Sequence, residues 1–236
     1  MNKRLLPRRV LSADTCRTFQ DLPHDKEHQM PKILLTRHGH VNGISPERFR
    51  GQTELTLTDK GVAEAAALAE RINGEWHPAA IYTSPLQRCI ATGEAIATAT
   101  RAPCRVLKSL IDLNYGAWQG HTLEEVRGHS PALFALWHFA PQLVRFPQGD
   151  SLQDLCARAA DTIRFVLEHH HDETIVLVGH DSVNRAILLQ ILDQPPSAYW
   201  RLAQDPCALS ELEVTHSHAR VLRMNDTRHL ANIFQS

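Results

Sequence analysis

The strongest constraint on the fold of this chain is a set of short apolar runs that alternate with longer amphipathic segments. The runs at residues 32–36, 80–84 and 174–178 have the length of buried strands, and apolar residues at helical spacing follow each one. Strands that alternate with helices pair into a parallel sheet, and the helices then cover both of its faces. We therefore expect an α/β fold, a three-layer, mostly parallel open sheet with helices on both faces.

The remaining segments complete this pattern. Further helices or strands are expected at residues 59–73, 86–99, 104–107, 151–170, 182–192, 209–214 and 220–224. Thr58 is the predicted N-cap of the first helix, and Ser151 with Asp154 forms a predicted capping pair at the start of the long helix. We expect the last two strands to form a hairpin at one edge. The irregular segment 114–148 predicts a small helical insertion over the active site.

Composition excludes several classes of function. A net charge of −1 over 236 residues leaves no field that would attract nucleic acid or an anionic membrane. No stretch reaches the roughly 18 apolar residues of a membrane span. The five scattered cysteines include no C-x-x-C pair, so we expect buried thiols in a cytoplasmic protein, without disulfides or a zinc site. The run His169–His171 falls in the last turn of a predicted helix, where cationic residues are favoured, so no metal site is predicted there.

The N-terminal segment differs from the rest of the chain. Residues 1–30 have no clear period and lack the apolar stretch of a secretory signal. We expect a disordered tail at residues 1–30 and one domain at residues 31–236. Because Met30 directly precedes the first strand, we also expect the tail to be a mis-assigned start, which the intact mass of the native protein would test.

Three of the predicted strands end in polar, phosphate-suited side chains. Arg37 and His38 follow the first strand, Arg88 lies in the first turn of the helix after the second, and His180 follows a late strand. Ligands of open α/β sheets bind at the carboxyl ends of the strands, so His38 and His180 face one crevice if their strands are neighbours. The glycine beside each histidine is expected to let the backbone approach a ligand closely. Two guanidiniums and two imidazoles suit a compact, multiply charged oxyanion such as phosphate.

Three motifs carry a resemblance to a known family. RHG after the first strand, SPLQR after the second and GH after the late strand resemble the histidine phosphatase superfamily, in its phosphoglycerate-mutase-like branch. The resemblance covers residues 32–193. It implies a phosphomonoester hydrolase that acts through a phosphohistidine on a small phosphorylated metabolite, without a metal or other cofactor. It also implies that His38 is the nucleophile and that Arg37, Arg88 and His180 bind the phosphate.

The proton donor has two candidates. The family usually places a glutamate four residues before the glycine of a G-x-W-x-G segment, and this position is Asp112 here, one methylene shorter. Asp181 is the alternative general acid, because a His-Asp pair carries the proton donor in the acid-phosphatase and phytase branch. We favour Asp112, since the chain lacks the longer R-H-G-x-R-x-P opening of that branch.

The segment after the first histidine also departs from the family. His40 and Val41 replace the usual acid and hydroxyl, so His40 either touches the substrate or is solvated. Asn42 is a candidate phosphate ligand, although it is out of step with the family's asparagine.

Three other functions compete with hydrolysis. A phosphoglycerate mutase needs an extended basic lid, and the insertion at 114–148 carries only Arg127 and Arg145, so we expect hydrolysis rather than transfer. A non-catalytic phosphate-binding protein is a second alternative, since an aspartate stands at the acid position. The third is an α/β-hydrolase with Asp181 as nucleophile, but Val183 is too bulky for that elbow.

Overall fold

The structure is a computed structural model that describes residues 30–215, 218–231 and 233. The expected tail, apart from Met30, lies outside the described residues. The strands are β1 (Lys32–Arg37), β2 (Ala80–Thr83), β3 (Cys104–Val106), β4 (Thr174–Gly179), β5 (Leu209–Val214) and β6 (Ala219–Asp226). The α-helices are α1 (Asp59–Glu75), α2 (Gln87–Thr100), α3 (Leu123–His129), α4 (Pro131–Phe139), α5 (Leu152–His169) and α6 (Asp181–Ile191). None of the described helices is both long enough and apolar enough to cross a membrane.

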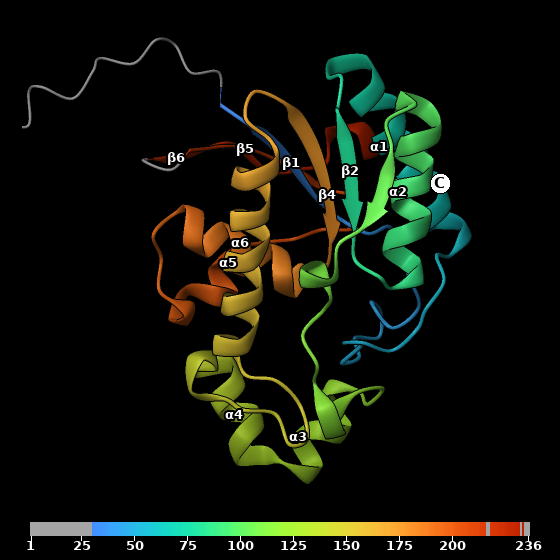
Figure 1. The fold of residues 1–236 in the computed structure, drawn as a ribbon. Coiled ribbons are helices and arrows are strands. Elements are labelled where there is room, and N and C mark those ends of the chain that lie inside the picture. Colours follow the sequence, from blue (N-terminus) through green and yellow to red (C-terminus); the bar gives the residue numbers. More distant parts are fainter. Residues whose placement is uncertain (1–29, 216–217, 232, 234–236) are drawn as a thin grey trace, which may run out of the picture.

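The strands form one mixed sheet of order β3-β2-β4-β1-β5-β6 (Figure 1). β1, β2, β3 and β4 run parallel, whereas β5 pairs antiparallel with β1 and β6 pairs antiparallel with β5. The expected α/β class and the expected hairpin at one edge are both confirmed. The order places β1 beside β4, although about 140 residues of sequence separate them.

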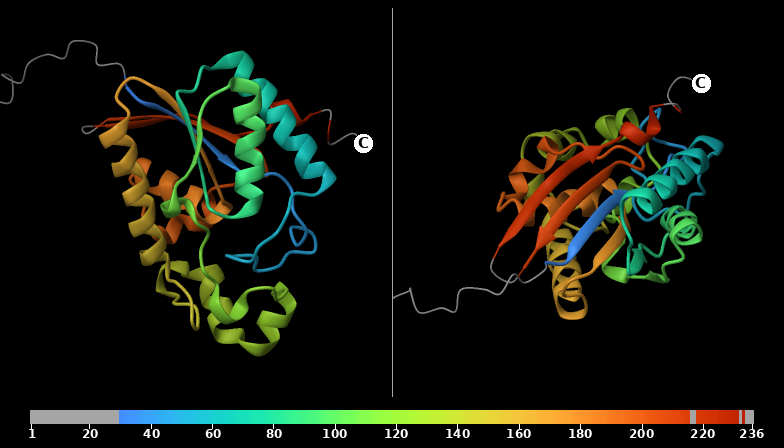
Figure 2. Two further views of the ribbon diagram at one scale, coloured as in Figure 1. Left: turned by 45° about the vertical axis from the view of Figure 1, so that its right-hand side comes forward. Right: turned by 90° about the horizontal axis from the view of Figure 1, so that it is seen from above.

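Helices cover both faces of this sheet (Figure 2). Side chains alternate along a strand, so Leu34 and Val176 pack with α1 and α2, while Leu35 and Leu177 pack with α5 and α6. Strands buried on both sides need apolar residues at every position, which explains the unbroken apolar runs of β1 and β4.

Local capping sets where the helices start. The Thr58 hydroxyl accepts a hydrogen bond from the Gly61 N–H at 3.2 Å, and Ser151 and Asp154 form a reciprocal capping box at α5. Both predicted caps are confirmed. The second predicted helix starts one residue later than expected, at Gln87, because Leu86 takes the extended N-cap conformation.

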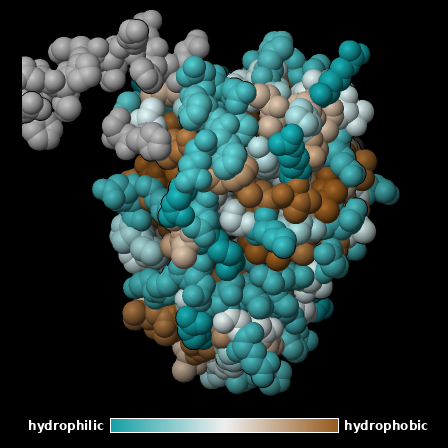
Figure 3. All heavy atoms as spheres, in the orientation of Figure 1, coloured by the Kyte–Doolittle hydropathy of each residue, from teal (hydrophilic) through white to brown (hydrophobic). Residues whose placement is uncertain are grey.

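The insertion at residues 114–148 contains α3 and α4 and lies beyond the carboxyl ends of β2 and β4 (Figure 1). Its own core is aromatic: Phe146 contacts Trp118 and Trp137 with ring centroids 5.1 and 5.0 Å apart. Phe139 and Leu143 remain 88% and 67% exposed, and Figure 3 shows an apolar patch over α4 in addition to apolar areas in the upper half of the same face. The contact of Trp118 with Phe146 makes Trp118 part of the aromatic core of the insertion.

The glycine after His38 serves packing. A methyl group on Gly39 would lie 2.5 Å from the Gly61 carbonyl oxygen, and one on Gly61 would lie 2.1 Å from the His40 carbonyl oxygen. The loop after β1 therefore crosses the first turn of α1 at backbone contact distance. The sequence predicts a ligand next to Gly39, but the structure places the backbone of α1 there.

This close crossing predicts an unusual effect of a helical Gly→Ala substitution. Gly61→Ala should lower the free energy of unfolding by about 1–3 kcal/mol, because the added methyl group would clash with the His40 backbone, which cannot move away without distorting the loop. Gly74→Ala in the same helix meets nothing within 4 Å and should be neutral or stabilising, by up to about 1 kcal/mol. Urea unfolding of both variants checks this, and equal effects would contradict the contact.

Candidate active site

The pairing of β1 with β4 brings the two histidines together. Arg37 stands opposite Gly179 in the register, so the next residues, His38 and His180, leave the sheet side by side. Their rings lie 5.1 Å apart between centroids at an angle of 62°. Both side chains are buried. The structure therefore joins the two strand ends in one site.

Hydrogen bonding selects the tautomer of His38. Its Nδ1 lies 2.8 Å from the Gly39 carbonyl oxygen, which can only accept, so Nδ1 carries the proton. Nε2 is then left with its lone pair and accepts a hydrogen bond from Arg88 Nε at 3.2 Å. Burial first, and then Arg37 and Arg88, hold the pKa of His38 well below its ordinary value of 6.5. His38 is thus a neutral imidazole whose unprotonated Nε2 faces Arg88 inside the site.

His180 presents the opposite nitrogen to the site. Its Nδ1 accepts from Arg88 Nε at 3.2 Å, and its Nε2 lies 2.7 Å from the Ser84 hydroxyl at the end of β2. Burial, Arg88 and His38 lower the pKa of His180 well below 6.5. The Nε–H of Arg88 is therefore shared between both imidazoles.

Arg88 is fully buried at the start of α2 and ties two loops to the site. Its Nη1 and Nη2 donate to the carbonyl oxygens of Thr53 and Gly51 at 2.7 and 2.6 Å. Nη2 also lies 3.2 Å from Oδ2 of Asp112. A fully buried guanidinium needs this many acceptors, and they aim its Nε at the histidines.

Arg37 is also buried, but only part of its guanidinium is satisfied. Nη1 donates to the Gln204 carbonyl oxygen at 2.7 Å, whereas Nε and Nη2 have no hydrogen-bond partner among the described residues. Buried donors without a partner are costly, so a native site that keeps them is arranged for an acceptor that arrives with the ligand. An anion would satisfy both donors.

Asp112 and Asp181 both reach the site, with different environments. Asp112 Oδ1 accepts from the Ser182 hydroxyl and, at 2.9 Å, from the Leu113 N–H. Burial and the charge of Asp181 raise the pKa of Asp112, against the opposite effect of Arg88. Burial acts in the same direction on Asp181, but the surrounding arginines outweigh it and hold the pKa of Asp181 below its ordinary value. Asp112 is the carboxyl group that holds a proton more readily.

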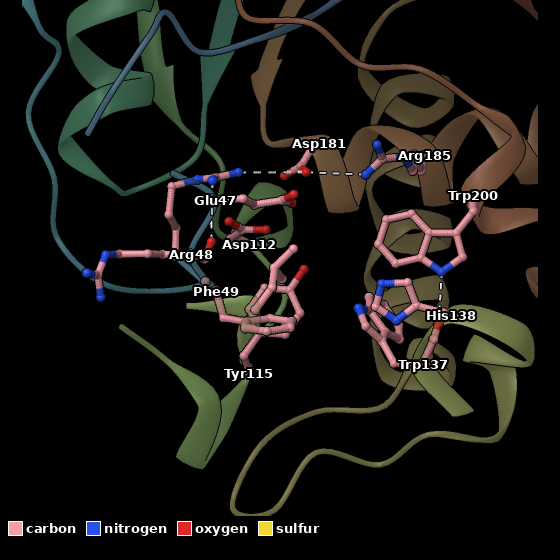
Figure 4. Close-up of a pocket in the computed structure, with 13 residues that line it drawn as sticks. Glu47, Arg48, Phe49, Asp112, Tyr115, Trp137, His138, Asp181, Arg185 and Trp200 are labelled. Atoms are coloured by element: carbon pink, nitrogen blue, oxygen red, sulfur yellow. Dashed lines mark hydrogen bonds and ion pairs between the residues drawn. The ribbon is translucent and has the colours of Figure 1, made fainter. Parts of the chain in front are cut away.

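A pocket opens next to these groups (Figure 4). Asp112 and Asp181 lie on one wall, and the insertion supplies Tyr115, Trp137 and His138. The remaining lining residues are Glu47, Arg48, Phe49, Arg50, Gly51, Leu123, Arg185 and Trp200. The insertion therefore does lie over the site, and Trp137 both packs its core and lines the pocket.

Two residues singled out in the sequence lie elsewhere. Asn42 is exposed and lines a second, shallower hollow with Arg48 and Thr53, apart from the two histidines. His40 turns toward α1, where its ring Nδ1 lies 2.9 Å from the Thr58 hydroxyl and its backbone N–H donates to Oε2 of Glu64 at 2.7 Å. His40 is partly buried, and its contact with the Thr58 cap is one that neither expectation included.

No metal cluster accompanies the site in the part of the chain that the structure describes. There, no group of three or more His, Cys, Asp and Glu side chains is placed to hold a metal ion. In the run His169–His171, His170 instead bridges the Tyr82 hydroxyl and Glu173, at 2.9 and 2.5 Å.

Sequence reasoning missed three side chains near the reacting centre. Ser182 donates to Asp112, while Arg50 and Arg185 flank Asp181. For Arg185 a signal was available, because it stands four residues after Asp181 in a predicted helix, the spacing of an ion pair. Ser182 directly follows Asp181 in the chain, but only the fold brings its hydroxyl to Asp112 and Arg50 to Asp181.

The lowered pKa values of the two histidines predict a pH dependence of stability. In the unfolded chain each of these histidines binds a proton as the pH drops below 6.5, whereas in the folded chain it stays neutral. The free energy of unfolding therefore falls as the pH drops below 6.5. Each imidazole contributes a slope of about 1.4 kcal/mol per pH unit down to its folded pKa. Urea unfolding between pH 7.5 and 5.5, without phosphate, should show a smaller slope for His38→Gln than for the wild type. An unchanged slope would contradict the buried neutral imidazole.

Comparison with known proteins agrees with this geometry. The histidine phosphatase superfamily (branch 1) pattern matches residues 33–227. Phosphoserine phosphatase 1 of Hydrogenobacter thermophilus is 29% identical over 205 residues, which is 87% of this chain and 97% of the relative. A metal-independent phosphoserine phosphatase of Arabidopsis thaliana is 30% identical over 167 residues, 70% of each chain. The solved structure of YhfR from Bacillus stearothermophilus superposes with a TM-score of 0.80 at 27% identity, over 85% of this chain and 99% of that one.

The sheet, the paired histidines and these matches define a phosphatase of the phosphohistidine type. The chain belongs to the histidine phosphatase superfamily, branch 1. It is a hydrolase that releases phosphate from a small phosphorylated metabolite through a phosphohistidine intermediate.

Proposed function

We propose that His38 is the nucleophile of this phosphatase and that phosphoserine, or a close analogue of it, is the substrate. The carrying observation is the pair of buried imidazoles that share one Arg88 N–H, with the His38 Nε2 lone pair directed into the site. A phosphate oxygen would take over the shared N–H of Arg88, and Arg37 would offer its two unpartnered nitrogens to other oxygens. His180 would hold the third side of the phosphate once protonated beside the dianion.

The chemistry then proceeds in two displacements. In the first, Nε2 of His38 forms a bond to phosphorus while the bond to the ester oxygen breaks, and Asp112 donates its proton to that oxygen. In the second, Asp112 takes a proton from water, the water oxygen bonds to phosphorus, and the bond to Nε2 breaks. The pKa of Asp112 is already raised by burial and Asp181, and a bound dianion raises it further. This supports Asp112 over Asp181 as the general acid.

The direct test is to trap the intermediate. The protein is mixed with ³²P-labelled phosphoserine and quenched in alkali, because phosphohistidine survives alkali better than acid. We expect label on the peptide that contains His38 and release of free phosphate that EDTA does not reduce. Label on another residue, or no release from any phosphomonoester, would contradict the proposal. 2-Phosphoglycerate formed from 3-phosphoglycerate faster than free phosphate would favour the mutase.

Two further features are part of the proposal. One phosphatase domain at residues 31–236 is supported by the family match over 33–227 and by a sheet whose strands span residues 32–226. A cytoplasmic location without a nucleic-acid partner is supported by the free thiols of Cys89, Cys104, Cys156 and Cys207 and by the net charge of −1.

A further inference from the structure

The pocket beside the phosphate site carries charges that the two displacements leave unused. Two arginines approach the carboxylate of Asp181 at its wall: Arg185 Nη1 lies 3.2 Å and Arg50 Nη2 3.9 Å from Oδ2. Figure 4 shows Asp181 and Arg185 joined along the wall above the pocket. Two cations face one anion here, while Arg48 and Glu47 in the rest of the lining offset each other, so one positive charge remains when Asp112 is protonated as the general acid. This wall suits a ligand group with a single negative charge better than a second dianionic phosphate.

Arg185 is held in place on several sides. Its Nε donates to the Leu202 carbonyl oxygen at 2.8 Å, and its guanidinium lies over the rings of Tyr199 and Trp200 at 5.2 and 5.3 Å from their centroids. Its side chain is only 12% exposed. A guanidinium fixed in this way binds a planar carboxylate at little entropic cost.

The position of Arg185 on α6 sets the size of the ligand. His180 is the N-cap of α6, and Arg185 lies five residues later, about one and a half turns or roughly 7 Å along the axis. Arg185 lines the same pocket as Asp112, whose Oδ2 lies 3.6 Å from His180 Nδ1, so a leaving group that extends from the phosphate into this pocket meets Arg185. A leaving group without a carboxylate would leave the charge of Arg185 unused.

We propose that Arg185 binds a carboxylate in the leaving group, so that the enzyme selects phosphorylated hydroxy acids and amino acids with a carboxylate on the carbon next to the ester carbon. The inference rests on the proposed function and deepens it. Asp181 is the positioning residue that keeps Arg185 and Arg50 together at the pocket wall. Its role as an ionised partner of these arginines also explains why Asp181 is unsuited to donate a proton.

The test compares matched substrates that differ in the carboxylate. Phosphoserine is paired with phosphoethanolamine, and 3-phosphoglycerate with glycerol 3-phosphate. Arg185→Met keeps much of the packing on Trp200 but removes the charge. We expect kcat/KM to fall about 30-fold for the two carboxylate substrates, mainly through KM, and less than about threefold for their partners. Arg185→Lys should restore part of the loss, because it returns the charge without the planar fork.

The controls separate binding from structural damage. Arg201→Met removes an exposed arginine from the same short segment as Trp200, outside the pocket lining, and should change no kcat/KM more than about twofold. An equal loss for both members of each pair in Arg185→Met would mean a structural role and would overturn the proposal. So would a wild-type enzyme that shows no preference within the pairs while it still hydrolyses them. If the wild type releases phosphate neither from these four substrates nor from p-nitrophenyl phosphate, the proposed function itself fails.

Discussion

His38→Ala should abolish turnover, with a loss of kcat of about 10⁴-fold or more, because it removes the proposed nucleophile. The Nε–H of Arg88 donates to Nε2 of His38 at 3.2 Å, so this nitrogen carries no proton and the imidazole is held in place. The measurement is phosphate release under single-turnover conditions, together with loss of label from the protein after an alkaline quench.

His40→Ala is the matched control. His40 lies two residues further along but bonds to the Thr58 hydroxyl of the α1 cap, so we expect less than about a threefold change in kcat and a modest loss of stability. A His38→Ala protein that folds and keeps more than about one per cent of the activity would exclude His38 as nucleophile. Thermal unfolding of both variants shows that a loss of activity is not a loss of fold.

Asp112→Asn should slow the first displacement, the phosphorylation of His38 measured in a single turnover, by about 10²–10⁴-fold with glycerol 3-phosphate and by about tenfold or less with p-nitrophenyl phosphate. An alkoxide cannot leave without a proton, whereas p-nitrophenolate leaves without one. The asparagine keeps the oxygen that accepts from Ser182 and the Leu113 N–H, so the local structure should survive.

Asp181→Asn is the comparison that decides the assignment. Its carboxylate pairs with Arg185 and Arg50, so its loss should affect both of these substrates to a similar extent. The assignment is wrong if the dependence on the leaving group appears in Asp181→Asn and is absent from Asp112→Asn. The two substrates lack a carboxylate, which keeps this test independent of carboxylate binding by Arg185.

The local elements of this protein were predictable because their causes are local. The apolar runs of β1 and β4, the Thr58 cap and the capping box of Ser151 and Asp154 depend on residues within a few positions of one another. The edge hairpin and the two covered faces follow from the alternation of strands and helices. The choice of Asp112 over Asp181 came from the resemblance, and the structure adds its physical support through their different surroundings.

The detailed contacts of the site were not predictable in this way. Asn42 stands four residues after His38 in the chain but lines a different hollow, since the loop after β1 turns to cross α1. The acceptors that aim Arg88, the carbonyl oxygens of Gly51 and Thr53, are backbone atoms, and every residue has one. No residue type marks such a position in a sequence.

By itself, the sequence determined which strands and helices form and which polar side chains stand at the strand ends, because periodicity and capping act over short stretches of chain. Only the tertiary structure decided that Arg88 bridges His38 and His180, that Ser182 holds Asp112, and that Arg185 faces the pocket. These contacts join residues from separate segments, so they arise from the order of strands in the sheet and the paths of the loops between them.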